Sequence, residues 1–436
     1  MKKISAAVLV IGFFVLSTNA SAATWVKQSA LADWTSIASS SNGQRLVASP
    51  FSGYLYTSKD GGVTWTQRIS SGKAHNWYSV SASADGLKLA AADNQIVGEL
   101  NGGYIYTSMD GGETWIKQSN SGLYRWWSVA SSADGTKLIA GDNTNSTENY
   151  IHLSKDGGKN WVTQNPGGGI HTWVSVASSA DGSKLVAVDN FDRKGYIHTS
   201  IDGGATWTMQ LGSGQYTWTS VASSADGTKL VATGGLHMYT STDSGVTWTE
   251  RASSGVWNHV SSSADGLTLA VVHTAISGRT SKNSVHLSFD GGITWTPQSI
   301  PSGSNQPQNV TVSRDGTKVF AVTGAYGTTA ANFKLGNIWT LDLNGSNTTS
   351  VVLEKKQEVD SVKTELQKIA TASSEAKITP ITDSVKQEKP KTDNSTNRSI
   401  EKTKNIDDSI TNQQQPSQVQ KTSFWKRIKN VFGRIF

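Results

Sequence analysis

The sequence predicts an all-β protein, a seven-bladed β-propeller whose four-stranded blades are closed into a ring by pairing of the N- and C-terminal strands. A polar phrase, seen as "TSKDGGVTW" at residues 57–65, occurs six times in the 436-residue chain. A second phrase, seen as "WVSVASSADGSKLVA" at residues 173–187, alternates with it and occurs seven times. The composition, with 42 Gly, 16 Trp and no Cys, suits many short strands joined by tight turns rather than a disulfide framework.

The two phrases define a repeat with the period of a propeller blade. Successive aspartates of the first phrase stand 41 to 50 residues apart. Each repeat contains four short runs with strand chemistry, of the types "WVSVAS", "KLVA", "YIYTS" and "TWTxQ". Ala-Asp-Gly joins the first pair and Asp-Gly-Gly the second, and both supply residues that tolerate positive φ in hairpin turns. Four antiparallel strands in a repeat of about 45 residues predict one blade each.

The order of the repeats predicts how the ring closes. The first blade is expected from Trp34 to Arg68, while residues 309–343 supply only three strands of the seventh. The missing strand is at the other end of the chain, because "ATWVKQS" at residues 23–29 is similar to the outer-strand phrase "ETWIKQS" at residues 113–119. We therefore expect the two ends of the propeller, residues 23–345, to complete one blade together.

The pattern Ser-x-Asp-x-Gly-x-Thr-Trp resembles the Asp-box, or bacterial neuraminidase repeat (BNR), of sialidases, sortilin-type receptors, xyloglucanases and photosystem II assembly-factor propellers. The resemblance covers about three quarters of the chain. We expect the aspartates to be structural, because a carboxylate in a tight turn accepts backbone N–H groups while the Trp packs beneath the hairpin. These aspartates are Asp60, Asp110, Asp156, Asp202, Asp243 and Asp290.

A metal or cofactor is not expected from the sequence. Calcium is the alternative use of the Asp-box carboxylates, but each loop supplies one carboxylate where Ca²⁺ takes six or more oxygens. The chain contains no Cys/His metal motif, no phosphate loop and no nucleophile elbow. We therefore predict no metal site and no cofactor.

The remaining loops are expected to gather on the opposite face of the disc and to form a candidate ligand site. They differ from blade to blade, and loops held on a rigid scaffold are the usual place of function. The candidate ligand-binding residues are His75, Tyr124, Arg125, Asp93, Asn94, Asp142, Asn143, His171, Asp189, Asn190 and Tyr216. Two alternatives stay open: the Asp-Asn pairs cap strand ends, and the Trp that opens each blade packs in the core rather than on a ligand.

The residues favour a binding scaffold over an enzyme. A sialidase clamps the carboxylate of its substrate with clustered arginines, and the Arg-Ile-Pro motif of that family is absent. Another glycosidase needs two carboxylates that flank a cleft, and no spacing selects a pair. The carboxylates outside the turns are Asp93, Glu99, Asp142, Glu148, Asp189 and Asp192. No catalytic residue is therefore assigned.

The resemblance to photosystem II stability and assembly-factor-like propellers implies an exported, non-catalytic scaffold that binds a protein or glycan partner on the loop face. We expect a monomer. The alternative is an exo-sialidase-like or other glycoside hydrolase that acts on extracellular glycans. Nucleic acid is not expected as a partner, because residues 23–345 carry 21 Lys or Arg against 22 Asp or Glu although the whole chain has a net charge of +6.

The N-terminal residues have the layout of a targeting signal. Lys2 and Lys3 precede an apolar run that ends in a small-residue "ASA". This is the layout of a secretory signal, so residues 1–22 are expected to be cleaved and the protein to be periplasmic or extracellular. The alternative is an uncleaved N-terminal anchor.

The composition of the C-terminal tail changes at residue 346. Residues 346–421 are rich in Lys, Glu, Gln, Ser, Thr and Asn, which predicts a mostly disordered linker. Residues 422–436, "TSFWKRIKNVFGRIF", predict a basic amphipathic helix that docks on an anionic membrane surface, or alternatively on a protein partner or the propeller. Its apolar face includes Phe424, Trp425, Ile428, Phe432 and Ile435.

Overall fold

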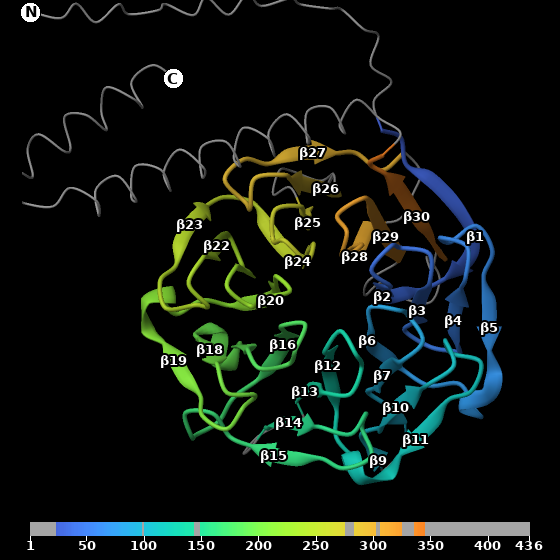
Figure 1. Cartoon of the computed structure of the whole chain (residues 1–436), viewed down its shortest axis with the longest axis horizontal. Coiled ribbons are helices and arrows are strands. Elements are labelled where there is room, and N and C mark those ends of the chain that lie inside the picture. The colour runs from blue at the N-terminus through green and yellow to red at the C-terminus, as the bar shows by residue number, and fades with distance from the viewer. Residues whose placement is uncertain are drawn as a thin grey trace, which may run out of the picture. The chain divides into compact units, whose positions relative to one another are not determined.

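The computed structural model describes residues 23–97, 100–143, 149–274, 283–301, 306–324 and 335–344. These residues form seven four-stranded antiparallel sheets arranged in a ring (Figure 1), which confirms the predicted fold class. The predictions for residues 1–22, the linker 346–421 and the helix 422–436 with Phe424, Trp425, Ile428, Phe432 and Ile435 lie outside the described residues. Within the described part of the chain, no helix has the length and hydrophobicity needed to span a membrane.

The first four blades each run from an innermost to an outermost strand in chain order. Blade one consists of β2 (Trp34–Ser39), β3 (Leu46–Pro50), β4 (Leu55–Ser58) and β5 (Thr66–Arg68). Blade two consists of β6 (Trp77–Ala82), β7 (Leu89–Asp93), β10 (Ile105–Ser108) and β11 (Ile116–Gln118). Blade three consists of β12 (Trp126–Ser131), β13 (Leu138–Asp142), β14 (Ile151–Ser154) and β15 (Val162–Gln164). Blade four consists of β16 (Trp173–Ser178), β17 (Leu185–Asp189), β18 (Ile197–Ser200) and β19 (Thr208–Gln210).

The last three blades follow the same order, except that the outermost strand of blade seven comes from the N-terminal side. Blade five consists of β20 (Trp218–Ser223), β21 (Leu230–Gly234), β22 (His237–Ser241) and β23 (Thr249–Ala252). Blade six consists of β24 (Val256–Ser262), β25 (Leu269–Thr274), β26 (Asn283–Ser288) and β27 (Thr296–Gln298). Blade seven consists of β28 (Gln306–Val312), β29 (Lys318–Gly324), β30 (Gly336–Asp342) and β1 (Val26–Ala32).

The loops contain only short elements. A two-stranded hairpin, β8 (Ile96–Val97) and β9 (Leu100–Asn101), follows the second strand of blade two. Three 3₁₀ turns lead from one blade to the next and one follows β17: they are η1 (Ile69–Ser71), η2 (Ser119–Ser121), η4 (Leu211–Ser213) and η3 (Phe191–Arg193).

Pairing of β1 with β30 closes the ring, as the repeat order predicted. Lys27 is opposite Trp339 and Val26 is opposite Thr340 in this antiparallel pair. Figure 1 shows the blue β1 beside the orange β30 at the rim of the disc. Trp25, which is 8% exposed, packs in one core cluster with Trp339. Because both ends of the propeller contribute to blade seven, this blade has its fourth, outermost strand like the others, and β30 is not left as an unpaired edge.

A circle of backbone hydrogen bonds joins the seven blades near the centre of the ring. The turn between the first and second strands of each blade donates one N–H to a carbonyl in the same turn of the next blade, at 2.7 to 2.9 Å. The donor–acceptor pairs are Ser41–Ala84, Ala84–Ala133, Ala133–Ala180, Ala180–Ala225, Ala225–Ala264, Ala264–Arg314 and, closing the circle, Asp315–Ser41. Each blade therefore gives and receives one bond.

In blades two to five, the Trp that opens the inner strand packs between two blades. Trp77, Trp126, Trp173 and Trp218 are fully buried. Each indole N–H of these four donates to a carbonyl of the preceding blade; Trp126, for example, donates to Gly103 at 3.2 Å. These four Trp side chains therefore pack in the core and are not available to stack on a ligand.

The Asp-box turns are held by their own side chains. In blade two, Asp110 accepts hydrogen bonds from the Ser108 hydroxyl at 2.8 Å and from the backbone N–H and hydroxyl of Thr114 at 3.0 and 2.6 Å. The Ser108 hydroxyl in turn accepts a hydrogen bond from the N–H of Gly112. Gly112 has a φ of 89°, a backbone conformation that favours glycine. Equivalent bonds form at Asp60, Asp156, Asp202, Asp243 and Asp290. Where Asn160 replaces the Thr, its amide donates to Asp156 instead.

The closing strand makes a first prediction testable. Trp25→Ala removes a large buried side chain that directly precedes β1 and packs in one core cluster with Trp339 of β30, and we expect the free energy of unfolding to fall by about 3 kcal/mol. Val26→Ala is the matched control, because Val26 is the next residue and is 57% exposed. Urea denaturation measures both variants, and equal stability of the two would contradict the predicted role of the closing strand.

The turn carboxylates predict a loss of stability in acid. The Ser132 hydroxyl, followed by the N–H and hydroxyl of Thr136, lowers the pKa of Asp134 to about 2. Hydrogen bonds from Ser179 and then Ser183 lower the pKa of Asp181 to about 2. The unfolded chain has a carboxyl pKa of about 3.9, so this stabilisation is complete above that pH and is lost as the pH falls towards 2.

The measurement is the midpoint of thermal unfolding between pH 4 and pH 2. We expect the midpoint of the unmodified chain to fall more steeply with decreasing pH than that of an Asp134→Asn, Asp181→Asn double variant, whose side chains do not titrate. Parallel pH profiles for the two proteins would show that these turns add no acid sensitivity.

Candidate functional site

The disc has two faces with different connections. On one, here called the turn face, the Asp-box turns contact the turns between first and second strands; in blade two, the Gly111 N–H donates to the Leu87 carbonyl at 2.8 Å. The other, here called the loop face, holds the connections that follow each second strand and those that lead into the next blade. The predicted ligand-binding residues all belong to these connections of the loop face or to the strand ends beside them.

The predicted acidic residues are buried rather than displayed on the loop face. Asp93, Asp142 and Asp189 are the last residues of β7, β13 and β17, and they are 1%, 0% and 4% exposed. Each carboxylate lies against an imidazole: Asp93 is 2.7 Å from His75, Asp142 is 2.7 Å from His152 and Asp189 is 2.9 Å from His171. They therefore hold blade and loop together and do not line an open surface.

The asparagines that follow these acids bond through their backbones. The N–H of Asn94 donates to Asn76, that of Asn143 to Arg125 and that of Asn190 to Thr172, at 2.8 to 3.0 Å. In each case the acceptor is the residue before the buried Trp of the same blade. This is the strand-capping role that the sequence left open. Asp192, a further carboxylate candidate, lies in η3 and is exposed, whereas Glu99 and Glu148 lie outside the described residues.

The predicted His and Tyr residues occupy one repeated position, two residues before the buried Trp. Tyr124 packs on Trp126 and on His152, with ring centroids 5.3 and 4.6 Å apart. Tyr216 packs on Trp218, and its hydroxyl lies 2.8 Å from that of Tyr239. Because His75 and His171 make the same contacts in blades two and four, these residues fill the space beneath the loops.

The third strand supplies a second aromatic position that sequence reasoning missed. Tyr106, His152, His198 and Tyr239 occupy it in blades two to five. The first position reads His, Tyr, His, Tyr in the same blades, so blade four alone of the four has a histidine at both. Burial, and then the charge of His171, lowers the pKa of His198 to about 4. The His198 ring is therefore neutral at neutral pH.

An aromatic row on the loop face was also missed. Phe51, Tyr78 and Trp127 lie in adjacent blades, with ring centroids 6.0 Å apart for the first pair and 5.0 Å for the second. Phe51 is 39% exposed, and the other two are partly exposed. Tyr78 and Trp127 directly follow the buried Trp of β6 and β12. The corresponding residues of blades one, four and five are Thr35, Val174 and Thr219.

A cavity adjoins this row. It has a volume of about 270 Å³ and lies where blades seven and one meet on the loop face. Its walls include Phe51 itself, Tyr54, Tyr56, Leu335, Asp33 and Gln67. Phe51 is thus shared between the row and the cavity, so the row and the cavity, to which Tyr54 and Tyr56 add two further aromatic rings, adjoin one another.

A second cavity of about 210 Å³ occupies the central channel. It is lined mostly by Ser, Ala and Val of the seven inner strands, together with His259, Asn309 and Arg314. Burial lowers the pKa of Arg314. The residues that line this channel include no Asp or Glu.

Comparison with known proteins identifies the repeat and the fold. Residues 286–297, in blade six, match the model of the BNR/Asp-box repeat. No curated protein sequence matches the chain. The resemblance inferred from the six Asp-box phrases is therefore supported by a family-model match as well as by the seven-bladed structure.

Several solved propellers share the fold. The structure described as "YCF48 bound to D1 peptide" has a TM-score of 0.52 and 15% identity, covering 74% of this chain and 98% of that one. YCF48 from Cyanidioschyzon merolae has a TM-score of 0.51 and 15% identity, with 73% and 98% covered. The WD40 repeats of RRP9 have a TM-score of 0.56 and 9% identity, with 74% and 99% covered. At these identities the likeness shows the propeller fold alone.

Proposed function

We propose that this propeller is a non-catalytic binding module that holds an extended peptide segment of a protein partner on its loop face. The observation that carries the proposal is the surface formed by Phe51, Tyr78, Trp127 and the adjoining cavity. Aromatic residues are enriched at protein interfaces, and Trp and Tyr dominate the residues whose truncation costs most binding energy.

The dimensions of this surface suit a short peptide. The three rings of the aromatic row span at most about 11 Å between the outer centroids. An extended chain advances about 3.3 Å per residue, so the row would contact about three consecutive residues. The cavity of about 270 Å³ beside Phe51 can take one apolar or aromatic side chain that anchors the peptide.

The fold comparison supports a peptide as the ligand class. One of the solved structures that share this fold, that of YCF48, contains a bound D1 peptide. The near-neutral charge of residues 23–345 points to apolar contacts as the main source of affinity. Binding is therefore expected to change little with salt concentration.

Replacement of Trp127 tests the proposal. Trp127→Thr removes the largest ring of the row, and a central Trp at an interface contributes at least about 2 kcal/mol. We expect peptides selected from a random display library on the unmodified chain to bind the variant at least about thirtyfold more weakly. Fluorescence anisotropy of a labelled selected peptide measures the dissociation constants.

Two controls separate binding from folding. Thr already occupies the equivalent position as Thr35 and Thr219, so Trp127→Thr should unfold at the same temperature as the unmodified chain. Ile201→Ala changes a residue that is 68% exposed on the turn face and should leave binding unchanged. Failure to select any peptide, or equal affinity of Trp127→Thr, would overturn the proposal.

We further propose that the protein is exported and that residues 422–436 dock it on an anionic membrane surface. Lys426, Arg427 and Lys429 beside Trp425 and Ile428 support this, because basic residues and aromatic anchors favour anionic interfaces. The linker of residues 346–421 would then hold the propeller near the membrane.

Liposome flotation tests the docking segment. We expect the full chain to float with vesicles that contain an anionic lipid and to remain behind with vesicles of neutral lipid. A chain that ends at Gln420 lacks the segment and should not float with either. Equal flotation of both chains with the anionic vesicles would rule out this segment as the membrane contact.

A further inference from the structure

His198 is a buried imidazole that lacks hydrogen-bond partners. It is fully buried in β18, and neither ring nitrogen is bonded to any group of the described chain. The equivalent His152 of blade three has both nitrogens satisfied, one by Asp142 at 2.7 Å and one by the Thr163 hydroxyl at 3.2 Å. In blade four, the residue in the place of Thr163 is Met209, which has no hydroxyl. A buried polar group without a partner is rare and calls for an explanation.

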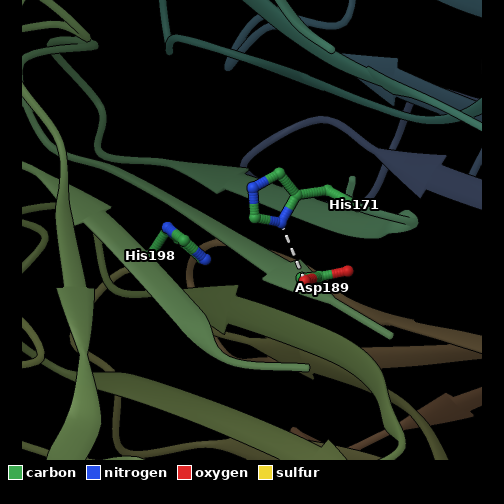
Figure 2. A group of neighbouring side chains, drawn as sticks. All are labelled: His171, Asp189 and His198. Carbon is green, nitrogen blue, oxygen red and sulfur yellow. Dashed lines mark hydrogen bonds and ion pairs between the residues drawn. The ribbon is translucent and has the colours of Figure 1, made fainter. Parts of the chain in front are cut away.

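The unpartnered ring faces a second imidazole and a carboxylate. His171 leads into β16, Asp189 ends β17 and His198 lies on β18, so three neighbouring segments of blade four supply the group. One ligand atom from each residue lies within 4.8 Å of the others. Figure 2 shows a nitrogen of His198 pointing towards Asp189 and the ring of His171. The two imidazole rings are nearly perpendicular, with centroids 5.3 Å apart.

The hydrogen bonds of His171 leave a position for a cation. Its Nε2 lies 2.9 Å from the Gly168 carbonyl, and its Nδ1 lies 2.9 Å from Oδ2 of Asp189. A neutral imidazole carries one N–H and can donate to only one of these two oxygens. When Nε2 donates to Gly168, the lone pair of Nδ1 faces a carboxylate oxygen, and a proton or metal ion is needed to bridge them.

We propose that His171, Asp189 and His198 bind a divalent first-row transition-metal ion of the Zn²⁺ class. Two imidazoles and one carboxylate suit such ions, whereas Mg²⁺ and Ca²⁺ prefer all-oxygen sites. Three protein ligands leave a fourth position for water or an exogenous ligand. Donors around one Zn²⁺ stand roughly 3.3 Å apart, so rotation of the His198 ring and a shift of about 1 Å complete the site.

The surroundings of the three ligands are those of a metal site. With an ion on Nδ1, the Nε2–H of His171 would donate to the Gly168 carbonyl at 2.9 Å, as metal-bound imidazoles do to second-shell carbonyls. The other oxygen of Asp189, Oδ1, accepts the N–H groups of Thr172 and Phe191 at 2.8 and 2.9 Å, which fixes the orientation of the carboxylate beside the two rings.

A glycine loop covers the site. Gly167, Gly168 and Gly169 all have positive φ, between 67° and 90°. A Cβ on Gly167 would lie 3.2 Å from Cε1 of His198 and 4.0 Å from Nε2 of His171, so this loop passes directly over both rings. The corresponding connections into blades two, three and five contain the 3₁₀ turns η1, η2 and η4. Residues 167–169 therefore place no side chain over the two rings.

The chain itself provides variants that keep the fold and remove a ligand. Blade two has Tyr106 in the place of His198, and blade three has Tyr124 in the place of His171. His198→Tyr and His171→Tyr therefore recreate arrangements that two other blades already accommodate. His237→Ala is the control, because it breaks the His237–Glu250 pair, in which a histidine also lies against a carboxylate, at 2.8 Å, but both side chains are accessible to solvent.

The experiment is a calorimetric titration of the full, chelator-treated chain with Zn²⁺. We expect one ion per chain for the unmodified protein and for His237→Ala, and dissociation constants at least about a hundredfold higher for His198→Tyr and His171→Tyr. Zn²⁺ should raise the unfolding temperature of the first two proteins only. The eight histidines all lie between residues 75 and 286, so the tail contributes none to the titration.

A spectroscopic readout keeps the test independent of variant stability. Co²⁺ bound to the unmodified chain should give the intense visible absorption of a four-coordinate ion with nitrogen and oxygen ligands, and Zn²⁺ should displace it. The inference fails if the unmodified chain binds no ion, if either Tyr variant folds and binds Zn²⁺ as tightly as the unmodified chain, if His237→Ala abolishes binding, or if bound Co²⁺ has a weak six-coordinate spectrum.

Discussion

Closure of the ring is the constraint on which the rest of the structure depends. Each blade gives one backbone hydrogen bond to the next through its first turn, and the seventh bond, from Asp315 to Ser41, completes the circle. That bond requires blade seven to stand beside blade one, a position that β1 fixes by pairing with β30 and then continuing directly into β2. A single hydrogen bond contributes only about 1 kcal/mol. Here, however, the hydrogen bonds and the buried Trp side chains between blades all require the same placement of each blade beside the next.

A closed ring of near-identical units makes positions comparable between blades. Where six of the seven blades carry the same residue, as at Trp126 or at Asp110, that residue supports the scaffold. Where the residue changes at a fixed position, the scaffold does not dictate it. The aromatic row arises in this way, because Tyr78 and Trp127 stand where other blades have Thr or Val. The paired histidines of blade four arise in the same way. Function is therefore best sought in departures from the repeat.

The sequence predicted the architecture because every local signal repeated with one period. The blade count, the closing strand at residues 23–29 and the turn positions of the Asp-box all follow from that period. The loop face did not follow from it. Asp93, Asp142 and Asp189 were recognisable as residues that end strands, but the sequence does not show that loops fold over them or that His152 and His198 reach them from the third strand. The exposure of Trp127 could not be predicted either, because the sequence has two adjacent Trp residues and only the structure shows that Trp126 is buried and Trp127 is partly exposed.

The two faces of the disc differ in how their carboxylates are buried and bonded. On the turn face the carboxylates are at least partly exposed and accept hydrogen bonds from residues within their own turn, so each carboxylate is satisfied locally. On the loop face Asp93, Asp142 and Asp189 are buried, and each lies against a histidine 10 or 18 residues away. Burying a charge is costly unless it is paired and hydrogen-bonded. In blades two and three one histidine meets that requirement. In blade four one histidine meets it and a second is buried beside it without a bond, which packing alone does not require, because Tyr106 fills the same place in blade two.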